Sequence, residues 1–81
     1  VSIGLVPKGT GGIIVTGTAG NIPNSSAIFQ MDSTTQGFLP PRMTTTQRDA
    51  ISSPIAGLII YNSTTNKLNV FTTIWEAITS A

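Results

Sequence analysis

Residues 37–62, GFLPPRMTTTQRDAISSPIAGLIIYN, constrain the fold more than any other segment, because several independent local signals within them agree on one path. Pro40 and Pro41 lack an amide proton and fix φ, and each biases the residue before it toward extended backbone. The chain is therefore expected to enter this segment as an extended arm, in which the two proline nitrogens cannot donate to a strand ladder.

A short helix is predicted directly after the two prolines. Thr44 and Gln47 have the spacing of a capping box, in which the hydroxyl accepts from the backbone of the third helical residue and the Gln side chain accepts from the cap. We expect a helix over residues 45–53 that Pro54 ends. Gly57 then provides a joint before the β-branched and aromatic run LIIY, which predicts a buried strand over residues 58–61.

Two further strands are predicted after that one. Residues 62–66, NSTTN, are expected to form a hairpin loop in which Asn66 adopts a positive φ at low cost. Alternating apolar residues then predict strands over residues 68–71 and 74–79, with a reversal between them. The sequence thus predicts a mainly β fold with one short α-helix and a three-stranded C-terminal meander.

The N-terminal part, residues 1–26, is predicted to be a separate β- and Gly-rich segment. Residues 1–6 favour a short strand ended by Pro7, and a glycine-rich turn leads to a second strand over residues 13–16. Residues 17–26, GTAGNIPNSS, form a connector without periodicity. A strand over residues 27–32 opens the second part, residues 27–81.

Eighty-one residues suffice for one domain, and a chain of this size buries only about 60% of the surface that its unfolded form exposes. Such small domains usually depend on disulfides, a metal or partner subunits. The chain has no Cys and no His, and its only acidic residues, Asp32, Asp49 and Glu76, are too scattered for a ligand set. We therefore expect no metal and no cofactor, and partner subunits are the remaining source of stability.

Charged residues make up 9% of the chain, against about 25% of an average soluble domain. The net charge of +1 is not gathered into a basic patch, which argues against binding nucleic acid. No apolar run approaches the roughly 18 residues of a membrane span, so we expect no membrane insertion. Because the chain begins at Val1 without an initiator Met, we expect it to be a piece of a longer protein.

Apolar residues occur on both faces of the predicted meander, and one short helix cannot cover two faces. We therefore expect other copies of the chain to cover one of them, and the pattern leaves open which. One core face is expected to consist of Leu58, Ile60, Leu68 and Val70, and the second to include Ile59, Phe71 and Trp75. The full set of interface or core candidates is Ile59, Tyr61, Phe71, Trp75 and Ile78.

The residues GFLPPRMTTTQRDAI, SPIAGLIIYN and NKLNVF, followed by the single Trp75, resemble a module found near the C-termini of bacteriophage tail fibres and of fibre or collagen-like surface proteins of large DNA viruses. The similarity covers roughly residues 27–78. It implies a small intertwined homotrimer at the virion surface, at the tip of a fibre or tail fibre. On this reading residues 1–26 lie next to the fibre shaft and residues 27–81 form the head module.

Catalysis is not expected, because a nucleophilic Ser or Thr needs a base within hydrogen-bond reach and the chain lacks His and Cys. Arg42 and Arg48 are the charges expected to matter structurally. A planar guanidinium can hold several backbone carbonyls at once, and the extended arm around the prolines supplies them. The alternative is that both side chains are simply solvated.

We therefore expect a non-enzymatic head domain that ends and registers a three-chain fibre and mediates host attachment. Its receptor would be a glycan or protein on the host surface. Candidate receptor contacts are Thr64, Asn66 and Trp75, since an aromatic ring can stack on a sugar while amides and hydroxyls bond its hydroxyl groups. The alternative is a purely structural trimerisation module that binds no receptor, and a related bacterial surface module would keep the same fold.

Overall fold

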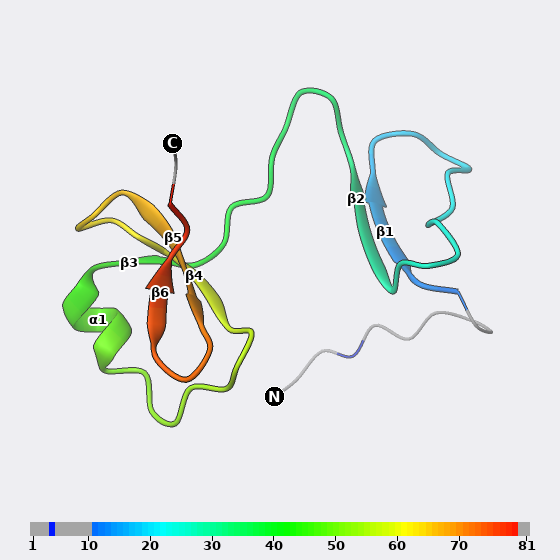
Figure 1. Cartoon of the computed structure of the whole chain (residues 1–81). Coiled ribbons are helices and arrows are strands. Elements are labelled where there is room, and N and C mark those ends of the chain that lie inside the picture. Colours follow the sequence, from blue (N-terminus) through cyan, green and yellow to red (C-terminus); the bar gives the residue numbers. More distant parts are fainter. Residues whose placement is uncertain (1–3, 5–10, 80–81) are drawn as a thin grey trace. The chain divides into compact units, whose positions relative to one another are not determined.

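A computed structural model describes Gly4 and residues 11–79 of the chain. The chain divides into two compact units, Val1–Phe38, called unit 1, and Leu39–Ala81, called unit 2 (Figure 1). The strand expected over residues 1–6, and most of the glycine-rich turn that follows it, lie outside the described residues. Each unit is built around its own sheet.

Unit 1 holds a two-stranded parallel sheet, made of β1 (Ile13–Thr16) and β2 (Phe29–Asp32). The connector between these strands passes through Gly20 at φ 89° and returns the chain alongside its own start. Gly12, directly before β1, runs so close to the β2 side that a Cβ there would collide with the carbonyl oxygens of Ala27 and Ile28. A residue without a side chain is therefore required where the two segments meet.

The boundary between the units falls between Phe38 and Leu39, whereas the sequence suggested a division after Ser26. The difference has a simple cause. The strand beginning near Ala27 pairs along its length with β1, from Ile13 beside Phe29 to Thr16 beside Asp32. The parallel ladder therefore places this strand in the N-terminal unit.

Unit 2 is a four-stranded sheet with one short helix, in the sheet order β3-β4-β5-β6 (Figure 1). Its elements are β3 (Arg42–Met43), α1 (Thr45–Asp49), β4 (Ile59–Asn62), β5 (Lys67–Phe71) and β6 (Trp75–Ala77). Strands β4, β5 and β6 are successively antiparallel, which confirms the mainly β fold with one short helix and a three-stranded meander. The sequence did not predict β3, which adds a fourth, parallel strand beside β4.

The proline arm joins the sheet through its carbonyl groups. Tyr61 N donates to Pro41 O at 2.9 Å, and Ser63 N donates to Met43 O at 2.8 Å. A proline has no N–H to give, but its carbonyl oxygen remains a full acceptor. The arm can therefore end in an edge strand directly after two prolines.

The capping box predicted at the start of the helix is present. Gln47 N donates to Thr44 Oγ1 at 3.2 Å, and Thr44 N donates to Gln47 Oε1 at 2.9 Å. The helix is shorter than predicted, because it ends at Asp49 and the bonds from Ala50 N to Gln47 O and from Ile51 N to Arg48 O close a tight last turn.

Replacing Thr44 by Ala is expected to lower the free energy of unfolding by about 1 kcal/mol, the usual contribution of an N-cap hydroxyl. The substitution leaves Gln47 N without its acceptor. Thermal denaturation followed by circular dichroism measures the loss. Thr46→Ala is the control, since Thr46 is an exposed residue in the first turn of the same helix; equal effects of the two substitutions would show that the capping box contributes nothing.

The turns of unit 2 adopt the backbone that their residues favour. Asn66 closes the β4–β5 loop at φ 57°, as predicted, and Gly57 has φ 96° before β4. Gly57 N donates to Phe71 O at 2.7 Å, and Phe71 N donates to Leu58 O at 2.9 Å. These bonds extend the β4–β5 ladder to the residues just before the start of β4 and hold the joint against β5.

The strand register assigns the faces of the sheet differently from the prediction. Ile60 lies opposite Asn69, while Ile59 lies opposite Val70 and Tyr61 opposite Leu68. Cross-strand partners share a face, so Leu68 and Val70 lie on the face opposite to that of Ile60. The predicted core face of Leu58, Ile60, Leu68 and Val70 is therefore wrong, and so is the predicted grouping of Ile59 with Phe71 and Trp75. Alternation along one strand does not determine its register against the next.

We call the two sides the helix face and the open face. The helix face carries Ile60, Asn62, Lys67, Asn69, Phe71 and Trp75, and α1 lies against it because its side chains bond Asn62 and Asn69. The open face carries Arg42, Ile59, Tyr61, Leu68, Val70 and Glu76. Among the described helices and strands of unit 2, only α1 lies over the sheet.

Candidate functional site

Two buried asparagines form the centre of unit 2. Asn62 and Asn69 are each 1% exposed. Asn62 Nδ2 donates to Asn69 Oδ1 at 3.0 Å and to Thr45 Oγ1 at 2.9 Å. Asn62 Oδ1 accepts from Thr64 N at 2.9 Å, which shapes the loop after β4. One side chain thus connects two strands, the helix and the hairpin loop.

Arg48 extends this hydrogen-bonded network from α1 to the edge strand β6, where Trp75 lies. Its Nη1 donates to Asn69 Oδ1 at 3.0 Å, and its Nη2 lies 2.8 Å from Asp49 Oδ1. The guanidinium carbon lies 5.4 Å from the centroid of the Trp75 ring, within the range of a cation–π contact. The Trp75 ring meets Phe71 edge to face, with centroids 5.3 Å apart. The helix face therefore combines hydrogen bonds with an edge-to-face pair of aromatic rings.

The sequence reasoning missed Thr45, Asn62 and Asn69. A signal was available, because asparagine is depleted in strands. Asn62 lies two residues after Ile60, and Asn69 lies two residues before Phe71, so each asparagine shares a strand face with a large apolar residue. An asparagine at such a position requires hydrogen-bond partners when it is buried. This reasoning would have flagged the pair without naming its partners.

The predicted interface candidates are divided between the two faces. Ile59 and Tyr61 lie on the open face, where Ile59 is 45% exposed. Phe71 and Trp75 lie on the helix face and contact each other. Ile78 follows β6, is 52% exposed and donates from its N to Leu68 O at 2.8 Å. The five residues therefore do not form one patch.

The two arginines do not act together. Arg48 bonds to Asn69 and Asp49, so its guanidinium stabilises the helix face instead of the carbonyls of the arm. Arg42 lies in β3 opposite Tyr61, exposed on the open face. The arm-holding role therefore remains a prediction for Arg42 alone.

The predicted receptor contacts lie at two separate places. Thr64 and Asn66 belong to the β4–β5 loop, and Thr64 Oγ1 accepts from Thr45 N at 3.2 Å. Trp75 pairs with Phe71 at the opposite end of β5. A strand of this length separates the two places by about 14 Å, at 3.4 Å per residue. Trp75 therefore cannot join the loop in one compact contact.

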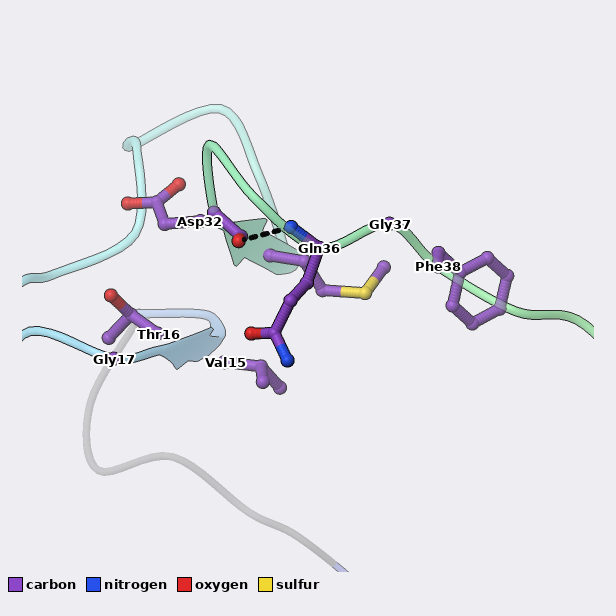
Figure 2. Close-up of a pocket in the computed structure, with 9 residues that line it drawn as sticks. Val15, Thr16, Gly17, Asp32, Gln36, Gly37 and Phe38 are labelled. Carbon is purple, nitrogen blue, oxygen red and sulfur yellow. Dashed lines mark hydrogen bonds between the residues drawn. The ribbon is translucent and has the colours of Figure 1, made fainter.

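Unit 1 presents exposed apolar side chains on one face of its small sheet. Val15 is 57% exposed, Phe29 52% and Met31 45%. An open hollow of about 650 Å³ lies beside the strand ends, lined by Val15, Thr16, Gly17, Met31, Asp32, Ser33, Gln36, Gly37 and Phe38. Figure 2 shows the Gln36 side chain extending toward Val15, while Gln36 N donates to Ser33 Oγ at 2.8 Å.

The hollow carries one carboxylate, that of Asp32, beside the hydroxyl groups of Thr16 and Ser33. Within the described part of the chain, no three His, Cys, Asp or Glu side chains gather where a metal ion would bind. A search of the same residues found no helix with the length and apolar character that crossing a membrane requires.

Comparison with known proteins identifies the family. The family described as the phage tail like trimerisation region matches residues 13–81. The chain belongs to this family. No curated protein and no solved structure gives a match.

As a phage tail like trimerisation region, the chain is a structural, tail-associated part of a phage fibre that assembles as a homotrimer. The match begins at β1 and includes every described helix and strand of unit 2. The trimerisation region therefore comprises both units, and the apolar surfaces of both belong to it. The resemblance to phage tail fibres is confirmed at the level of this family.

Proposed function

We propose that this trimerisation region ends a three-chain tail fibre and sets the register of its chains, without catalysis. One observation carries the proposal: among the described residues, Ile60 is the only buried hydrophobic side chain. Large apolar side chains stand exposed in both units, at Val15, Ile22, Ile28, Phe29, Met31, Phe38, Leu39, Ile55, Ile59, Ile74 and Ile78. A chain with this surface completes its core by joining copies of itself.

Each unit has an uncovered sheet face that further copies of the chain would cover. Parallel sheets are found almost only with both faces covered, and β1 and β2 form a parallel pair with exposed apolar side chains. In unit 2 the helix covers one sheet face and the other remains open. The low content of charged residues, 9%, keeps repulsion between the copies small.

Sedimentation equilibrium of the purified chain at micromolar concentration tests the proposal. The expected result is a single species with three times the mass of one chain, together with a melting temperature that rises with protein concentration. A folded monomer, or a stable dimer, would contradict it.

Host attachment is the second candidate function, and the β4–β5 loop favours it. Residues 63–66 are exposed, carry only hydroxyl and amide side chains, and are held in shape by Asn62. Such a loop offers hydrogen bonds to a polar receptor such as a glycan. In this function the trimer lies at the fibre tip.

An adhesion assay with the trimeric chain separates the two functions. If the loop binds a receptor, the chain adheres to host cells and blocks infection, and the variant with Ser63→Ala and Thr65→Ala loses adhesion while it keeps the trimer. A chain that trimerises but never adheres would show a purely structural module.

A further inference from the structure

We propose that the open face of unit 2 is the contact surface of the trimer, and that Arg42 of one copy pairs with Glu76 of the next. The occupants of this face are two further copies of the chain. The inference rests on the proposed trimeric function and identifies the surface that performs it.

The helix face is already complete within one chain. Asn62 and Asn69 are buried with partners on the helix and on each other, and Arg48 lies over the Trp75 ring. A second copy placed there would have to displace α1. The helix face is therefore the internal side of the subunit.

The open face has the opposite character. Ile59, Tyr61, Leu68 and Val70 form two adjacent cross-strand pairs, of which Ile59 is exposed and the other three are half-buried in the single chain. Such a contiguous apolar strip on two central strands is typical of a surface that other chains cover. In a trimerisation region the chains available to cover it are its own copies.

The charges on the open face stand at its two edges. Arg42 pairs with Tyr61 from the edge strand β3, and Glu76 pairs with Val70 from the other edge strand, β6. Three strand spacings separate these edges, about 14 Å at 4.8 Å each. The two charges are therefore too far apart to pair within one chain.

The remaining charged residues of unit 2 lie elsewhere. Arg48 and Asp49 pair with each other at 2.8 Å, and Lys67 lies on the helix face opposite Asn62. The open face therefore has one positive edge and one negative edge. Thr72 Oγ1 donates to Glu76 Oε2, which orients the carboxylate at its edge.

Threefold symmetry brings these two edges together. In a cyclic trimer each interface is heterologous, so one edge of a copy meets the opposite edge of the next. The β3 edge with Arg42 then faces the β6 edge with Glu76 in all three interfaces. A twofold contact between like edges would set like charges against each other, so this charge pattern favours the ring and fixes its direction.

Charge reversal tests the pairing in the full chain. Arg42→Glu and Glu76→Arg, made singly, are each expected to weaken trimer association about tenfold or more, because like charges then meet at every interface. The double variant restores the pair in reversed order and is expected to recover most of the loss. Lys67→Glu is the matched control, since it reverses a charge on the helix face and is expected to leave association unchanged.

Sedimentation of a dilution series measures trimer association for all four variants, and circular dichroism checks that each variant is folded. Recovery in the double variant supports the pairing. A double variant as weak as the single variants would overturn it, while the wild-type trimer would still uphold the proposed function. Glu76→Gln removes the charge but keeps an oxygen for Thr72, and it is expected to weaken association less than Glu76→Arg does.

A second substitution pair tests the apolar strip. Ile59→Ser is expected to weaken association about tenfold or more, since the interface would then bury a hydroxyl group where it had buried an apolar side chain. Ile55→Ser is the control, because Ile55 is 73% exposed in the loop before β4 and lies outside the sheet. Equal association of both variants with the wild type would show that the trimer uses another surface.

Discussion

Asn62→Ala is expected to lower the free energy of unfolding by about 3 kcal/mol, the largest loss from any single substitution considered for this chain, because several buried groups lose a partner at once. Asn69 Oδ1 and Thr45 Oγ1 lose the donor Nδ2, and Thr64 N loses the acceptor that holds the hairpin loop. The hairpin and the helix lose their common anchor, so both should loosen together.

Urea unfolding followed by far-ultraviolet circular dichroism, at fixed protein concentration, measures the loss. Ser63→Ala is the matched control, since Ser63 is exposed and directly follows Asn62 at the start of the β4–β5 loop, and its substitution should change stability by less than about 0.5 kcal/mol. If Asn62→Ala unfolds at the same urea concentration as Ser63→Ala, the buried amide network does not stabilise the fold.

Arg48→Ala is expected to lower the free energy of unfolding by about 2 kcal/mol, the cost of removing a charged hydrogen-bond donor together with a cation–π contact. Asn69 Oδ1 loses the Nη1 donor, and the Trp75 ring loses the guanidinium 5.4 Å from its centroid. Trp75 is the only tryptophan in the chain, so its fluorescence reports this site alone.

The emission of Trp75 should shift to longer wavelength in Arg48→Ala, because water replaces the guanidinium over the ring. The emission maximum of Arg48→Lys is expected to lie between those of the wild type and Arg48→Ala, since lysine keeps the charge but not the planar donor set. Lys67→Ala removes a positive charge from the same face without touching Trp75 and serves as the control. An unchanged emission spectrum in Arg48→Ala would contradict the contact.

Several features of the fold were predictable from the sequence because they depend on residues close together in the chain. The capping box needs only Thr44 and Gln47, and the positive φ of Asn66 needs only a tight loop. The meander follows from strand periodicity and loop length. The resemblance to phage tail fibres also came from contiguous motifs, and the family match supports it.

Other features depended on pairings that no local signal encodes. The parallel pairing of β1 with β2 joins segments separated by an irregular connector, and β3 forms only because Tyr61 and Ser63 donate to the arm. The role of Arg48 was misassigned because its partner, Asn69, lies 21 positions away. A partner so distant in the sequence can be identified only when the register of the strands is known.

The sequence by itself determined which segments turn, which extend and where the helix begins, since these choices rest on backbone preferences and bonds within a few residues. Only the tertiary structure decided which side chains share a face. A shift of one residue in the β4–β5 register would move the side chains of β5 to the opposite face of the sheet from their present β4 partners. The observed register places the asparagines under α1 and leaves Ile59 and Val70 on the surface that we assign to the neighbouring copies.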